Sequence, residues 1–408
     1  MLNNISSIKN FIYMFLAKGI DLFMPLIIIP ILVARIGMEN YGIIAMSLSL
    51  ALFVSTIVQY GFNYTGTREI SRSIKENKKN IGLISSKYLV SNHIIGLFCL
   101  ILLTLLLCVL DIEYELKFVY FFSLLYGVFY GLNPIWFFQG FESFKIIAII
   151  NSFFKVLYMV SIYLFVTDKS PLYLISFINF LSIFFVYLIN MAIIFLWYRV
   201  EFILLNFCEY VSVLKDDIYI FLNQLIPNLY NSFSIFYLGM VTNSMYAGIV
   251  SASVTMVEIV ITIFRILTNV FYPVLVKERL LFIKFSNSVI LISLFTTFIF
   301  YIFSPEIIKF LFEKNLEDIV LYTRILCLSI IFSVFYIIYG IIFNSLYNIE
   351  YRMTRYVIFI SCLAALVSFV ATPKFGAWVV ILVIFFSRFL FGLISYILYL
   401  KQKKASHI

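Results

Sequence analysis

Six charged residues of this sequence fall inside long apolar runs, where an ionised side chain needs a partner or water. They are Lys18, Asp21, Lys155, Glu258, Arg265 and Arg388. If all six line one water-filled cavity, four positive and two negative charges give its wall a net charge of +2, which suits an anionic ligand.

The alternative is that these charges stabilise a helical bundle. Lys18 and Asp21 are three residues apart, so on a helix they share a face. Glu258 and Arg265 are seven residues apart, so on a helix they lie on nearly the same face as well. Both pairs would then be internal ion pairs, while Lys155 and Arg388 would snorkel or pack on carbonyl groups.

The composition predicts the elements that carry these charges, because 63% of the 408 residues are hydrophobic and 12% are charged. This balance is typical of a polytopic membrane protein. Apolar segments of about 20 residues predict an all-α fold with about 12 transmembrane helices. They lie near 11–33, 41–63, 84–110, 118–138, 146–166, 172–197, 217–240, 245–271, 284–303, 321–347, 355–372 and 377–400.

Several function classes are disfavoured by the same sequence. The five cysteines show no C-x-x-C spacing and the two histidines lie far apart, so we expect no metal site. No phosphate-binding glycine motif is present. The net charge of +9 is better explained by membrane orientation than by nucleic acid, which we do not expect as a partner.

The basic residues predict the orientation. With the N-terminus inside, the cytoplasmic segments hold eighteen of the 29 basic residues and the outer segments hold seven. This excess favours cytoplasmic N- and C-termini.

The chain also shows a weak internal repeat. Sliding it by 206 residues aligns Gly42 with Gly248 and gives twelve identities over positions 12–57. We expect two six-helix halves, 1–200 and 217–408, joined by a cytoplasmic linker at 201–216. Repeats offset by six spans keep one orientation, which is typical of alternating-access transporters.

The predicted seventh span contains polar residues in "FLNQLIPNLYNSF" (221–233). The amides of Asn223, Gln224 and Asn228 are candidates to bind sugar hydroxyls. They are equally candidates for hydrogen bonds between helices.

Four stretches resemble a known family: "GMENYGIIAMSLSL" (37–50), "YGFNYTGTREIS" (60–71), "NPIWFFQGFESFK" (133–145) and the stretch at 221–233. The chain is similar to the Wzx-type O-antigen flippases. These belong to the polysaccharide transport family of the MOP superfamily, together with the MATE drug exporters and the lipid II flippase. The segment "NPIWFFQGFE" carries the most specific part of the resemblance, and we expect its Phe138 to Gly140 and Glu142 to be structural.

The resemblance implies a MATE/MOP-like bundle in the bacterial inner membrane that moves saccharide repeat units on undecaprenyl pyrophosphate to the periplasmic leaflet. It places Lys18, Asp21 and Arg265 among the cavity charges. The implied partners are this lipid-linked oligosaccharide, membrane lipid, a polysaccharide polymerase and a chain-length regulator. No cofactor is expected, and coupling to H⁺ or Na⁺ stays open, with Asp21 as a candidate proton or cation site.

Two other functions are alternatives for a membrane protein of this composition. A MATE-like cation-coupled exporter of small molecules should have a cavity with a net negative charge. The six charges predicted to line the cavity here sum to a net positive charge. A membrane polymerase or glycosyltransferase of the same pathway typically needs a sizeable outer loop with catalytic residues, and no outer loop here exceeds about twenty residues. We therefore do not expect an enzyme.

The orientation generates a first prediction. Reporter fusions after Lys79, Arg279 and Lys404 should report a cytoplasmic location, and fusions near Glu113 and Lys314 a periplasmic one, because the basic excess stays inside. Alkaline phosphatase and green fluorescent protein fusions measure this directly. One inverted fusion would break the map of spans.

Overall fold

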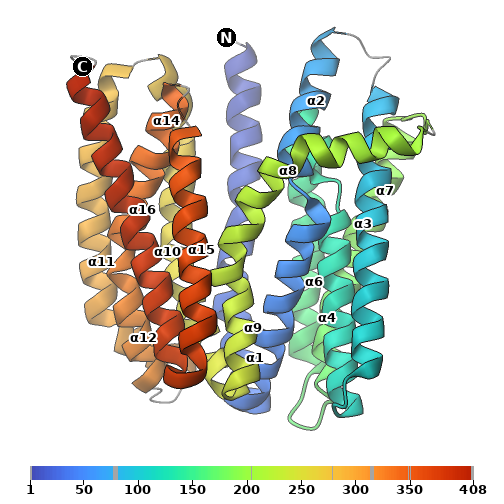
Figure 1. Cartoon of the computed structure of the whole chain (residues 1–408), viewed down its shortest axis with the longest axis vertical. Helices are drawn as coiled ribbons and strands as arrows, with labels where there is room; N and C mark the ends of the chain where they lie inside the picture. The colour runs from blue at the N-terminus through green and yellow to red at the C-terminus, as the bar shows by residue number, and fades with distance from the viewer. Residues whose placement is uncertain are drawn as a thin grey trace. The chain divides into compact units, whose positions relative to one another are not determined.

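The computed structural model describes residues 2–76, 81–203, 205–277, 279–312, 317–347, 349 and 351–405. This part of the chain is built from helices and contains no strand (Figure 1). The predicted all-α class is therefore confirmed for the described residues. The chain divides into two compact units, Met1–Met24 with Met46–Asn228 (unit 1) and Pro25–Ala45 with Leu229–Ile408 (unit 2).

The first helix contributes to both units. It is α1 (Leu2–Gln59), and its backbone leaves helical geometry at Gly37, with φ +82° and ψ 166°. Glycine adopts this conformation without the steric penalty that a Cβ would bring. The break separates the helices predicted at 11–33 and 41–63.

Unit 1 continues with short and long helices. They are α2 (Phe62–Glu76), α3 (Ile81–Val109), α4 (Tyr114–Leu132), α5 (Ile135–Gly140), α6 (Phe144–Phe165), α7 (Tyr173–Ala192), a π-helical turn (Ile193–Trp197) and α8 (Phe207–Tyr230).

Unit 2 holds the remaining elements. They are α9 (Ser232–Val241), α10 (Ser244–Lys277), a 3₁₀ turn (Arg279–Leu281), α11 (Phe282–Phe312), α12 (Glu317–Cys327), α13 (Ser329–Phe335), a π-helical turn (Tyr336–Ile342), α14 (Phe343–Leu346), α15 (Tyr351–Phe375) and α16 (Ala377–Ala405).

Ten helical segments of the described chain are long and apolar enough to cross a membrane. The number agrees with the prediction of about twelve when two features are considered. One segment, Phe23–Ile74, contains the break at Gly37. The predicted seventh span is not among the ten, because α8 ends at Tyr230 and α9 starts at Ser232.

Two glycines that the internal repeat aligns meet inside unit 2. A Cβ built on Gly42 of α1 would lie 1.9 Å from the carbonyl oxygen of Ser244, and one on Gly248 of α10 would lie 3.0 Å from the Cα of Gly42 and 3.1 Å from the oxygen of Met38. Residues 38 and 244 are themselves 206 apart. The contacts are thus reciprocal, as a two-fold relation between repeats would produce, and they use the close approach that small residues allow in membranes.

This crossing generates a second prediction. Gly42→Ala should lower the midpoint of thermal unfolding of the protein in detergent, because the new methyl group would overlap backbone atoms rather than a flexible side chain. The matched control is Gly19→Ala on the same helix, where a Cβ would meet nothing within 4 Å. That control should keep or slightly raise the midpoint. Equal midpoints for the two variants would contradict the tight crossing.

Candidate functional site

The charged residues of unit 2 form an ion pair that differs from the pairing considered above. Arg388 of α16 places Nη2 2.5 Å from Oε1 of Glu258 on α10, and its Nη1 donates to the hydroxyl of Ser329 on α13 at 3.2 Å. The Arg388 side chain is 10% exposed and that of Glu258 is 35% exposed. Glu258 is therefore paired across helices, and not with Arg265 along its own helix.

Arg265 lies seven residues after Glu258 on α10 and has an exposed side chain. Among the described side chains it forms no ion pair. An arginine in a helix apolar enough to cross the membrane is costly unless it meets water, lipid headgroups or a ligand. Arg265 is thus a cation available for an anionic ligand.

The other charges of the predicted cavity are placed less completely. Lys155 is half-buried on α6 of unit 1. Lys18 and Asp21 lie on α1, but their side chains are outside the described part of the chain. Because Lys155 belongs to unit 1 and Arg265, Glu258 and Arg388 belong to unit 2, the common cavity stays a prediction.

The three amides of α8 have different surroundings. Asn228 Nδ2 donates to the hydroxyl of Thr56 on α1 at 2.9 Å and to the carbonyl of Gln224 at 3.2 Å, so it joins two helices. The Nε2 atom of Gln224 is buried without a partner among the described atoms. Asn223 is half-buried. A buried donor without a partner is unfavourable, which makes Gln224 the best candidate of the three to bind a ligand or water.

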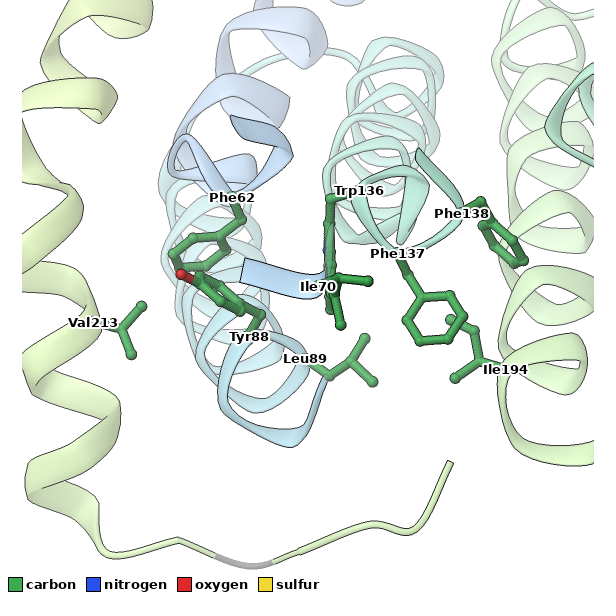
Figure 2. Packing of buried hydrophobic residues seen from close by; sticks show 9 residues of the cluster. All are labelled: Phe62, Ile70, Tyr88, Leu89, Trp136, Phe137, Phe138, Ile194 and Val213. Atoms are coloured by element: carbon green, nitrogen blue, oxygen red, sulfur yellow. The ribbon is translucent and has the colours of Figure 1, made fainter. Parts of the chain in front are cut away.

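The segment "NPIWFFQGFE" forms the centre of a buried cluster (Figure 2). Trp136, Phe137 and Phe138 of α5 are at most 1% exposed. The cluster also contains Phe62, Ile70, Tyr88, Leu89, Ile194 and Val213. Aromatic rings of this size bury a large apolar surface, so these residues stabilise unit 1.

The second family stretch packs directly on the first. A Cβ on Gly66 of α2 would lie 2.9 Å from Cε3 of Trp136, and one on Gly140 would lie 2.5 Å from Cγ2 of Ile70. The hydroxyl of Thr67 lies 3.2 Å from the carbonyl of Trp136. Buried residues of these two family stretches are therefore packed against each other, which supports a structural role for these residues.

The buried carboxylate of Asp217, which the sequence analysis did not single out, joins α8 to α2 within unit 1. Asp217 is 5% exposed and accepts a hydrogen bond from the hydroxyl of Thr65 on α2 at 2.7 Å. Nearby, the hydroxyl of Tyr60 donates to the carbonyl of Leu214 at 3.1 Å. The signal was present, since Tyr210, Val213 and Asp217 recur at helical spacing on the buried face of α8.

The ion pair of unit 2 generates a third prediction. Arg388→Met alone should destabilise the protein by about 1–3 kcal/mol, less than a fully buried pair would cost, because Glu258 is partly exposed. Adding Glu258→Gln should restore much of that loss, since the uncompensated charge is then removed.

A double-mutant cycle from thermal or denaturant unfolding in detergent measures this coupling. If the effects of Arg388→Met and Glu258→Gln are additive, the pair contributes nothing to stability.

Comparisons with known proteins identify relatives named as transporters. One is named "Putative O-antigen transporter", from Escherichia coli (strain K12), and is 25% identical over 272 residues, which are 66% of this chain and 65% of that protein. The chain thus matches slightly less than two thirds of the relative's length. These names support the prediction that the chain is not an enzyme.

Two solved structures share the fold. A multidrug resistance MATE family transporter of the MOP superfamily, in an inward-facing conformation, has a TM-score of 0.72 at 13% identity, covering 96% of this chain and 98% of that chain. The lipid II flippase MurJ, in an inward closed conformation, has a TM-score of 0.69 at 12% identity, covering 97% and 87%. At such identities the likeness shows the fold alone, and it confirms the predicted MATE/MOP-like class.

A family model described as "Polysaccharide biosynthesis protein" matches residues 7–279, more than half of the chain. Its match covers all four stretches on which the resemblance was based. The chain belongs to the polysaccharide biosynthesis protein family.

Proposed function

We propose that this protein is a flippase that moves lipid-linked oligosaccharide repeat units of a surface polysaccharide across the bacterial inner membrane. The carrier is undecaprenyl pyrophosphate, and movement from the cytoplasmic to the periplasmic leaflet occurs by alternating access. Family membership, relatives named as O-antigen transporters and a fold shared with the lipid II flippase support this proposal.

The charge of Arg265 carries the argument. Glu258 is the acidic residue nearest to Arg265 along α10, but it pairs with Arg388. Glu258 therefore does not neutralise the charge of Arg265. Guanidinium groups match phosphate oxygens and stay charged when desolvated, so Arg265 is suited to the pyrophosphate linkage. An exporter of cationic drugs would need the opposite charge, which disfavours that alternative.

The remaining parts of the proposal follow from the sequence. Two six-helix halves, 1–200 and 217–408, are joined at 201–216, and both termini lie in the cytoplasm. A polysaccharide polymerase and a chain-length regulator are the expected partners. A proton or Na⁺ gradient is a candidate driving force, with Asp21 as the group that would bind the cation.

A fourth prediction tests the role of Arg265. In a strain lacking its own flippase, Arg265→Ala should abolish surface polysaccharide while the amount of protein in the membrane stays normal. Arg265→Lys should rescue only partly, because an ammonium group cannot form the bidentate contact. Surface polysaccharide is measured by gel staining and protein by immunoblot.

The double variant Lys18→Met with Asp21→Leu extends the same assay to α1. If these residues are only a structural pair, removing both should be nearly neutral. If they act on substrate, export should fail as it does in Lys18→Ala alone.

Full export by the Arg265→Ala variant would refute the contact between Arg265 and the pyrophosphate.

A further inference from the structure

A cavity of about 660 Å³ lies in unit 1, and none of its described lining residues is among the candidate ligand-binding residues named above. It is bordered by the end of α2, the start of α3 and residues 197–203. Its wall is apolar at Ile74, Ile81 and Phe141, and charged at Arg199 and Glu201. Its described lining residues thus combine an apolar surface with one cation and one anion.

The two charges facing this cavity are not used elsewhere in the described structure. Arg199 and Glu201 have exposed side chains, and among the described residues neither forms an ion pair, with the other or with a third group. Two opposite charges two residues apart that do not neutralise each other can bind a ligand carrying both signs.

The backbone that presents these charges is held in place by its neighbours. Arg199 has a φ of +49°, a conformation that is uncommon for residues with a side chain and costs energy. A Cβ on Gly82 of α3 would lie 2.7 Å from the carbonyl oxygen of Glu201, and the N–H of Ile203 donates to the hydroxyl of Ser86 at 2.8 Å. The residues that follow Arg199 are therefore held against α3 by close packing and by a hydrogen bond.

The surroundings of this segment are typical of a membrane surface. Leu196 and Trp197 before the charged residues are each 78% exposed, and Phe202 after them is 50% exposed. Exposed apolar residues with a tryptophan beside charged groups are found at the level of lipid headgroups. This composition is the one expected of a segment at the level of lipid headgroups.

A second cavity flanks the same segment. It measures about 490 Å³ and is lined along α3 by Leu89 and Ile94, along the π-helical turn by Phe195, and by Phe202. Phe202 lines this apolar cavity, while the next residue, Ile203, lines the charged one. A charged cavity and an apolar cavity on either side of two consecutive residues match the two chemical parts of a phospholipid.

We propose that unit 1 binds one phospholipid whose headgroup carries a phosphate and a primary ammonium, which is phosphatidylethanolamine. Arg199 contacts the phosphate and Glu201 accepts hydrogen bonds from the ammonium, while an acyl chain occupies the apolar cavity. A headgroup with a phosphate but no ammonium would leave the carboxylate of Glu201 without a cation beside the phosphate. A quaternary ammonium has no N–H to donate. This site is independent of the proposed transport substrate.

Quenching of Trp197 fluorescence tests the site in the full-length protein. The protein is reconstituted in phosphatidylcholine vesicles that contain an equal small fraction of brominated-chain phosphatidylethanolamine, phosphatidylglycerol or phosphatidylcholine. Phosphatidylethanolamine should quench most. The dependence on headgroup should vanish in Trp197→Phe, which identifies the signal among the three tryptophans.

Substitutions of the two charges separate this site from general attraction to the membrane. Arg199→Asn keeps a residue that tolerates positive φ, and it should weaken the preference for phosphatidylethanolamine by roughly threefold to tenfold. Glu201→Gln should make phosphatidylglycerol bind at least as well as phosphatidylethanolamine. Arg72→Gln, which changes an exposed arginine of α2 in the same unit, should leave the preference unchanged.

Circular dichroism establishes that each variant is folded. If Arg199→Asn does not fold, the change of selectivity in Glu201→Gln decides alone. Equal quenching by all three headgroups in the unmodified protein would overturn the site. So would an effect of Arg72→Gln as large as that of Arg199→Asn, because the attraction would then belong to the surface charge.

Discussion

An ionised group inside an apolar bundle must be compensated, and this constraint organises the polar interior of unit 2. Arg388 satisfies it by contacting Glu258 on α10 and Ser329 on α13. One guanidinium thus connects three helices, because it offers several donors in a fixed plane. Arg265, on the same helix as Glu258, lacks a charged partner among the described residues. Arg388 is thus a structural charge, whereas Arg265 is available to bind a ligand.

Close backbone packing is the second constraint, since membrane helices gain little from apolar contact alone. At Gly42 and Gly248 the backbones of α1 and α10 approach so closely that a Cβ on Gly42 would overlap backbone atoms and one on Gly248 would be crowded by them. In unit 1, Gly66 and Gly140 likewise allow close packing, because the side chain of Trp136 packs on Gly66 and that of Ile70 packs on Gly140. Glycines thus mark the crossings at which these units are assembled.

The sequence was sufficient for the fold class, because apolar segments of about 20 residues identify membrane helices without tertiary information. It was not sufficient for the pairing of charges. Spacing along one helix offered Glu258 with Arg265 as one alternative, whereas the partner in the structure, Arg388, is 130 residues away and is brought close by packing of α10 and α16. The same limit hid the partner of Asp217, because Thr65 belongs to a helix that is distant in the sequence.

The most specific family stretch, NPIWFFQGFE, does not contain the groups that are candidates to bind a ligand. Trp136, Phe137 and Phe138 are buried, so their requirement for a precise shape makes the stretch recognisable in the sequence. Arg265 and Gln224, which have groups available for binding, lie outside the most specific stretch. A chain can therefore be assigned to its family from its packing, while its substrate must be sought in polar residues that packing leaves without partners.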